Sequence, residues 1–233
     1  MFFVWRIMKK AFSSLGRTDY IVWAVSVALV ILSYFLSASP SVLNTLTSVI
    51  GVSALIFVAR GQVLGQLLLA AFALLYGTVS VFHSYFGETA ICFLLSLPLA
   101  AFAIVTWYKN PYDDSGEVKV SRISARQLTL LILLTAGVTV AFYFILSLLG
   151  TASVIWSTVS VTTSFFAAGL TVLRSPYFAL GYVANDIILI VLWTIAAIGD
   201  PSCVSMVVCF AAFLLNDSYS FICWYRRKYL QAK

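Results

Sequence analysis

The chain has 233 residues, of which 62% are hydrophobic and 9% are charged, and its formal net charge is +6. Because soluble domains carry about 25% charged residues, these values exclude an ordinary soluble protein and predict an all-α membrane protein. The basic residues do not indicate nucleic acid binding, because they fall in the termini and in short hydrophilic gaps, where they set membrane topology.

The predicted elements begin with a basic, amphipathic N-terminus. Residues 1–19 carry Arg6, Lys9 and Lys10 between apolar side chains, a pattern typical of a helix on an anionic membrane surface or of a solvated tail. No cleavable signal peptide is expected, because the first long apolar run starts only at Tyr20. The apolar runs predict eight transmembrane helices. They lie at residues 20–37, 42–59, 63–82, 89–108, 127–149, 151–173, 177–198 and 202–224.

The 14 Lys and Arg residues lie in the N-terminus, the C-terminal tail and every second gap between spans. The other gaps contain none of them. By the positive-inside rule, both termini and the hydrophilic loop 109–126 are expected in the cytoplasm. The sequence therefore predicts a multi-pass protein of the plasma membrane, with residues 226–233 as a cytoplasmic tail.

The spans show an internal repetition. Residues 42–108 and 151–225 each predict three spans of similar layout. A unit of three spans reverses the side of the membrane, so two such units point the same way only if an odd span, 127–149, joins them. This predicts a 3+1+3 core of two parallel three-helix repeats, with 20–37 as an extra N-terminal helix.

Matching motifs mark the two repeats. Arg60 and Arg174 follow the first span of each repeat, and Trp107 and Trp224 end the third span. Tryptophans at span ends are typical of anchors at the membrane–water interface, and we expect Trp107 and Trp224 to lie there.

Two Asn-Asp pairs, Asn185-Asp186 and Asn216-Asp217, lie inside the last two spans. A carboxylate at membrane depth is a functional-site hypothesis by default. Each Asn offers a donor and an acceptor to a carboxamide or a ribose hydroxyl, or it bonds neighbouring helices. Each Asp is a counter-charge to a pyridinium or thiazolium cation, a neutral carboxyl, or a carboxylate that caps a hydroxyl between helices. Because adjacent helix positions point about 100° apart, we expect the Asn of each pair to face the pocket.

Aromatic and hydroxyl residues complete the predicted pocket. Tyr182 and Trp193 share a helix face with Asn185. Together with Trp156 they could stack on a flat ring, and a cationic ring would add about 0.5–2 kcal/mol. Thr163 continues the Trp156 face and adds a polar lining, unless its hydroxyl only bonds its own helix.

Other polar residues carry weaker signals. Gln62 and Gln66, one turn apart, either line an exit or reach the membrane interface. The four cysteines have no CxxC spacing and there is one histidine, so we expect no metal site, no disulfide framework and no cofactor.

Several motifs of this sequence are similar to those of a known family. The segment 72–88, FALLYGTVSVFHSYFGE, resembles the second core helix and outer turn of the PnuC family of vitamin transporters. Pro98, the end at Trp107-Tyr108-Lys109 and the Asn of Tyr-Val-Ala-Asn185 are also similar to its motifs. The resemblance covers about residues 20–228. It implies a SWEET-like fold and import of nicotinamide riboside, an NAD precursor, by facilitated diffusion, followed by trapping through cytosolic phosphorylation.

The resemblance also implies a substrate site at Asn185 and at Asn216-Asp217. Tyr182 stands where many members have Trp, and Ala100 where many have Gln. Relatives carry thiamine, riboflavin or deoxynucleosides, so these substrates stay as alternatives, and a non-transporting subunit or receptor is the alternative of another class. The expected partners are a small-molecule substrate and the lipid bilayer, with a homo-oligomer left open. Enzymatic activity is not expected, because each intramembrane Asp follows an Asn instead of the Gly-x-Gly of intramembrane aspartyl proteases.

Overall fold

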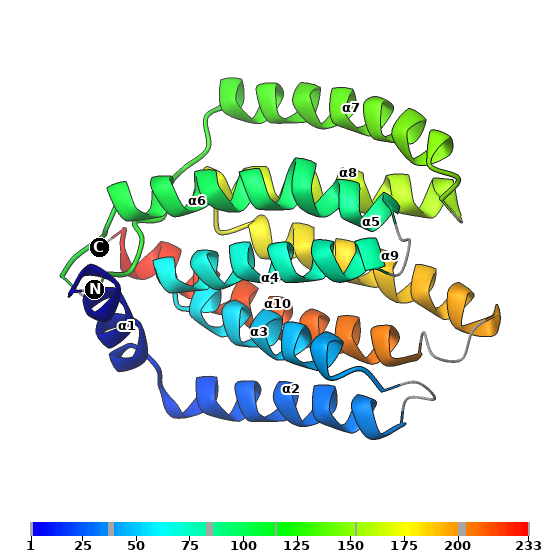
Figure 1. Cartoon of the computed structure of the whole chain (residues 1–233). Coiled ribbons are helices and arrows are strands. Elements are labelled where there is room, and N and C mark those ends of the chain that lie inside the picture. The colour runs from blue at the N-terminus through cyan, green and yellow to red at the C-terminus, as the bar shows by residue number, and fades with distance from the viewer. Residues whose placement is uncertain are drawn as a thin grey trace.

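The structure, a computed structural model, describes residues 2–36, 40–82, 86–114, 116–151, 153–199 and 204–232. Within them, seven helical stretches are long and apolar enough to cross a membrane, and α4 contains a shorter apolar stretch. The chain is therefore an all-helical, multi-pass membrane protein (Figure 1). Its helices are α1 Phe2–Ser13, α2 Arg17–Leu36, α3 Val42–Ala59, α4 Val63–Phe82, α5 Phe86–Ile91, the π-helical turn η1 Cys92–Ser96, α6 Leu97–Lys109, α7 Ala125–Leu148, α8 Val154–Val172, α9 Phe178–Gly199 and α10 Val204–Leu230.

Two of the described helices, α3 and α7, begin at side-chain caps. The Ser41 side chain accepts a hydrogen bond from the backbone N–H of Asn44 at 3.3 Å, which begins α3. Ser124 and Gln127 form a reciprocal capping box at the start of α7. Such caps satisfy backbone N–H groups that have no partner within the helix.

The expected span 89–108 is a composite rod of α5, η1 and α6. Pro98 follows the π turn, in which the Leu97 N–H bonds to the Cys92 carbonyl. Proline has no N–H to continue the α-helical ladder, and a wider turn before it accommodates the missing bond.

The helices lie side by side, with α7 along one edge of the bundle and α2 along the other (Figure 1). α7 contacts α8, and α2 contacts α3 and α10. Between these edges, α3 contacts α10 while α6 contacts α8. Both chain ends, the turns at Arg60 and Arg174 and the loop 110–124 lie at one end of the bundle (Figure 1). The basic gaps of the sequence therefore meet at the same end.

Trp107 and Trp224 form the buried centre of this end. Their exposed fractions are 1% and 0%, and their ring centroids are 5.2 Å apart. The indole N–H of Trp107 donates to the Thr171 carbonyl at 2.9 Å, and that of Trp224 donates to the Val58 carbonyl at 2.8 Å. The prediction that these residues anchor the membrane interface is wrong, because both turn inward, where a buried indole N–H requires an acceptor.

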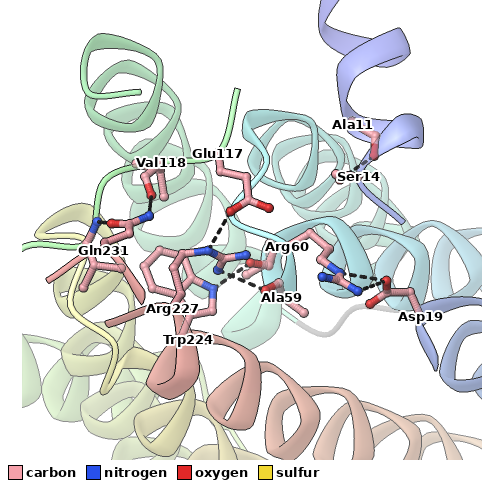
Figure 2. Close-up of polar contacts among 12 residues, drawn as sticks. Ala11, Ser14, Asp19, Ala59, Arg60, Glu117, Val118, Trp224, Arg227 and Gln231 are labelled. Carbon is pink, nitrogen blue, oxygen red and sulfur yellow. Dashed lines mark hydrogen bonds and ion pairs between the residues drawn. The ribbon is translucent and has the colours of Figure 1, made fainter. Parts of the chain in front are cut away.

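The loop 110–124 is fastened to the end of α10 (Figure 2). Arg227 donates from Nε to Glu117 Oε2 at 3.1 Å and from Nη1 to the Ala59 carbonyl at 3.2 Å. Gln231 bonds to the backbone of Val118 and Val120. Residues expected as a tail therefore continue α10 as far as Leu230 and hold the loop against the bundle.

The N-terminal helices are attached at the same end. Ala11 of α1 is fully buried beside Phe57 and Leu64. Asp19, at the start of α2, pairs with Arg60 at 2.5 Å (Figure 2). The hydrogen bond to this carboxylate raises the pKa of Arg60 above its usual value.

Candidate functional site

A cavity of about 180 Å³ lies inside the bundle. It is more than ten times the volume of about 10–15 Å³ that a single water needs, so it can hold an organic ligand. Its walls come from α3, α4, the α5–η1–α6 rod, α8, α9 and α10. Four of the predicted site residues line it, namely Tyr182, Asn185, Asp186 and Asp217.

Asn185 is held in the cavity wall by two hydroxyl groups of α8. Its Oδ1 accepts hydrogen bonds from Ser160 at 3.1 Å and from Thr163 at 2.9 Å. With the side-chain oxygen fixed in this way, the amide nitrogen is the group that remains to donate to a ligand. Thr163 therefore holds the Asn185 side chain, and it does not itself line the cavity.

Asn216 turns away from the cavity. Its Nδ2 donates to Ser26 Oγ of α2 and to the Ala212 carbonyl, both at 2.7 Å, and its exposed fraction is 0%. The expectation that the Asn of each pair faces the pocket is wrong for this pair, because α2 covers that face of α10 and offers a hydroxyl partner. Its neighbour Asp217 lines the cavity instead.

Asp186 and Asp217 meet in the cavity wall. The two side chains are hydrogen-bonded to each other, and each is 2% exposed. A hydrogen bond between two carboxyls requires that one of them holds a proton. The two Asn-Asp pairs are thus brought together through their acids and not through their amides.

Two predicted aromatic residues lie outside the cavity lining. Trp193 is buried in a core cluster with Cys209, Phe210 and Phe213. Trp156 is 38% exposed on α8. Neither side chain is placed to stack on a ligand in this cavity.

The cavity instead has an aromatic wall that the sequence analysis did not identify. Phe72 of α4 stacks on Tyr76 with ring centroids 5.6 Å apart, and it contacts Phe213 of α10 at 5.8 Å. Tyr182 adds a ring from α9, bonded through its hydroxyl to Thr171. Rings on several sides suit a flat ligand. The helical spacing of Phe72 and Tyr76, one turn apart, is the signal that could have revealed this wall.

Two polar cavity residues were also missed or left open. Gln66 of α4 lines the cavity, is 2% exposed, and its Nε2 has no hydrogen-bond partner among the described residues. Glu88, expected in an outer turn, lies in the first turn of α5 and lines the cavity. A buried donor without a partner is costly unless a ligand or water bonds to it, so the Gln66 amide is available to donate into the cavity.

Comparison with known proteins agrees with this architecture. Residues 41–226 match the family model described as nicotinamide mononucleotide transporter. A relative named nicotinamide riboside transporter PnuC, from Neisseria mucosa, is 27% identical over 189 residues, which cover 78% of this chain and 71% of the relative.

The fold also matches a solved structure. The crystal structure of the vitamin B3 transporter PnuC superimposes with a TM-score of 0.79 at 21% identity, covering 94% of this chain and 95% of the other. This match shows that the chain has the all-helical fold of that structure. Because the family model covers most of the sequence, the chain belongs to the nicotinamide mononucleotide transporter family, whose PnuC members are membrane transporters and not enzymes.

Proposed function

We propose that this transporter imports nicotinamide riboside by facilitated diffusion and that cytosolic phosphorylation then traps the substrate. The observation that carries the proposal is the cavity, which is lined both by the amides of Asn185 and Gln66 and by aromatic rings. A carboxamide and a ribose need donors and acceptors, and a flat ring needs aromatic faces. The name of the Neisseria mucosa relative supports the same substrate.

The binding roles follow from position. Asn185, Asp186, Asp217 and Tyr182 contact the substrate, with Gln66 as a further donor. Asn216, Trp193 and Thr163 act indirectly, by packing or by bonding other groups. Trp156, near the outer end of α8, is assigned no direct contact.

We further propose the 3+1+3 architecture with eight spans, α4 being the eighth. Reciprocal contacts support it: α10 of the second unit packs on α3 of the first, and α6 of the first packs on α8 of the second. The two indole hydrogen bonds follow the same exchange, from Trp224 to α3 and from Trp107 to α8. Such an exchange is expected of two equivalent units related by an axis along the membrane normal.

Both termini are assigned to the cytoplasm, in the plasma membrane. The support is the gathering of the basic gaps at one end of the bundle (Figure 1). A cysteine probe at Asp114, an exposed loop residue, tests this in a variant whose own cysteines are replaced. An impermeant reagent should label it only after the cells are opened, and labelling of intact cells would reverse the orientation.

α7 contacts α8 and only 17% of its membrane window is buried. This supports a lipid-facing position for its outer side. The oligomeric state is tested by measuring the mass of the purified protein particle in detergent. A mass of two or more chains would mean that another copy could cover the outer side of α7.

The function is tested by uptake into proteoliposomes. We expect radiolabelled nicotinamide riboside to equilibrate across the membrane without accumulating, and to accumulate only when a riboside kinase and ATP are enclosed. Uptake of thiamine, riboflavin and a deoxynucleoside is measured in the same way, and liposomes without protein are the control. Preferred uptake of another substrate would replace nicotinamide riboside, and accumulation driven by a proton or sodium gradient would overturn facilitated diffusion.

A further inference from the structure

Lys228, in the last turn of α10, lies among three tyrosine rings. Its ammonium nitrogen is 5.2 Å from the centroid of the Tyr177 ring and 5.8 Å from those of Tyr225 and Tyr229. Tyr177 directly precedes α9, so these four residues, here named the tyrosine–lysine cluster, join the start of α9 to the end of α10. None of the four lines the substrate cavity.

The positive charge of the cluster is not balanced within the described part of the chain. Lys228 makes no ion pair with a described carboxylate, whereas the neighbouring Arg227 pairs with Glu117. Lys228 donates a hydrogen bond to the Tyr177 hydroxyl at 3.1 Å. This bond raises the pKa of Lys228 above its usual value, so the ammonium group stays charged at neutral pH. The cluster is therefore a fixed cation at the surface of the bundle.

The cluster also presents hydrogen-bond donors that no described residue accepts. An ammonium group has three N–H bonds, and the Tyr177 hydroxyl accepts one of those of Lys228 while its own proton stays available. The hydroxyls of Tyr225 and Tyr229 are 3.0 Å apart, and a bond between them uses one of their two protons. A cation among available donors suits an anion with several oxygens, because charge-assisted hydrogen bonds are the strong ones.

The length of α10 places the cluster at the level of the lipid headgroups. α10 has 27 residues. At 1.5 Å per residue it is about 40 Å long, whereas the hydrocarbon core of a membrane is about 30 Å thick. The basic last turn of α10 marks the end that lies beyond the core, and this is the end of the bundle that we assign to the cytoplasm (Figure 1). The cytoplasmic leaflet is the one that carries anionic phospholipids.

Exposed apolar side chains lead from the cluster towards the membrane. Ile222 lies one turn before Tyr225 on α10, and Leu180 lies one turn after Tyr177 on α9, and both are exposed. α9 and α10 contact each other, so the two side chains belong to one face of the bundle. Acyl chains would cover these side chains, whereas a free phosphate would leave them in place without a contact. The surroundings of the cluster therefore favour a lipid over a soluble anion.

We infer that the tyrosine–lysine cluster binds the phosphate group of an anionic phospholipid of the cytoplasmic leaflet. The Lys228 ammonium and the tyrosine hydroxyls donate to the phosphate oxygens, and the acyl chains lie against Ile222 and Leu180. A zwitterionic lipid carries its own cation beside the phosphate, so the cluster should prefer a lipid with a net negative charge. The site lies outside the substrate cavity, and the inference does not depend on which substrate is transported.

The test is native mass spectrometry of the full-length protein in a neutral detergent. Phosphatidylglycerol and phosphatidylcholine with the same acyl chains are titrated separately, and the dissociation constant of the first bound lipid is measured. The wild type should bind phosphatidylglycerol at least about fivefold more tightly, the factor that one basic residue contributes near an anionic lipid. Lys228→Gln should remove most of this preference by weakening phosphatidylglycerol alone.

A matched control separates this site from the general positive charge of the same end. Lys119 is exposed in the loop 110–124. Lys119→Gln removes the same charge as Lys228→Gln and should change the preference by less than about twofold, because exposed charges away from the lipid are screened by salt.

Two further variants keep the test decisive if Lys228→Gln does not fold. Lys228→Arg keeps the charge and should keep the preference for phosphatidylglycerol. Tyr177→Phe keeps the ring and the charge but removes the hydroxyl, and should weaken phosphatidylglycerol by about fivefold, the value of one hydrogen bond. General electrostatic attraction would not respond to this change. The melting temperature of each variant with phosphatidylcholine shows whether it is folded.

Three results would overturn the inference. Equal affinities of the wild type for the two lipids would mean that the cluster does not select charge. Equal losses in Lys228→Gln and Lys119→Gln would assign the preference to the general charge of this end. Inorganic phosphate that displaces phosphatidylglycerol at the concentration of the lipid itself would mean that the cluster takes a soluble anion and that the apolar neighbours play no part.

Discussion

The two Asn-Asp pairs have the same dipeptide sequence but do different things in the fold. On α9, Asn185 and Asp186 both line the cavity. On α10, Asp217 lines the cavity while Asn216 bonds to Ser26 of α2. The difference lies in the neighbours: α8 presents hydroxyls that fix Asn185 at the cavity wall, whereas α2 presents a hydroxyl on the outer face of α10. One pair lines the cavity with both side chains, whereas the other places Asp217 in the cavity wall and Asn216 in a contact between helices.

The largest expected effect on substrate affinity comes from replacing the Asn of each pair by Leu, and it should differ between the two pairs. Asn185→Leu should weaken nicotinamide riboside binding by about ten- to a hundredfold, because an unpaired ligand group costs about 1–3 kcal/mol. Asn216→Leu should leave the affinity of the folded protein within about twofold and lower its melting temperature instead, since it breaks the bond to Ser26. Titration calorimetry and thermal melting of both variants measure this. A folded Asn185→Leu protein that binds like the wild type would place the pocket elsewhere.

Variants of Tyr182 test whether the aromatic ring that α9 places in the cavity contributes to substrate binding. Tyr182→Leu should reduce the affinity by about tenfold, because a ring over a cationic ligand contributes about 0.5–2 kcal/mol. Tyr182→Trp should preserve or strengthen binding, since it keeps an aromatic face. Equal losses in both variants would show that the hydroxyl bond to Thr171, and not the ring, is what matters.

Gln66 tests whether a buried donor without a protein partner serves the ligand. Gln66→Leu should lower the affinity by about fivefold, equivalent to one hydrogen bond of about 1 kcal/mol, while the melting temperature stays level or rises. Gln231→Leu, which removes a side chain bonded to the loop at the end of the bundle, is the control and should not alter binding. If Gln66→Leu lowers the stability without changing the affinity, the Gln66 side chain serves helix packing and not the ligand.

The smallest effect is expected at the partner of Asn216. Ser26→Ala removes the hydroxyl that accepts from Asn216 and should cost about 1 kcal/mol of stability, with no change in affinity. Urea unfolding or thermal melting in detergent measures it. A change in substrate affinity of this variant would mean that α2 influences the cavity, which would erase the distinction between the two pairs.

Sequence alone determined the parts of this protein that follow from solvent and local geometry. Apolar runs gave α3 and α4 their bounds, because a helix in lipid must satisfy its backbone internally and continue until polar residues begin. The placement of the basic residues predicted which turns share one end of the bundle, and the structure brings the α3–α4 turn, the α8–α9 turn, α1 and the end of α10 to one end (Figure 1). Periodicity also placed Tyr182 and Asn185 on one face, and both line the cavity.

Tertiary structure decided which way each of those faces points. A helical period states which residues share a face, but the direction of the face depends on the neighbouring helix. Asn216 points away from the cavity because α2 covers that face of α10 and offers the Ser26 hydroxyl. Trp107 and Trp224 point inward because each indole N–H donates to a backbone carbonyl, on α8 and on α3 respectively. Gln66 and Glu88 became cavity residues for the same reason, since the space that they line is enclosed by several helices, α4 and α5 among them, together with α9 and α10.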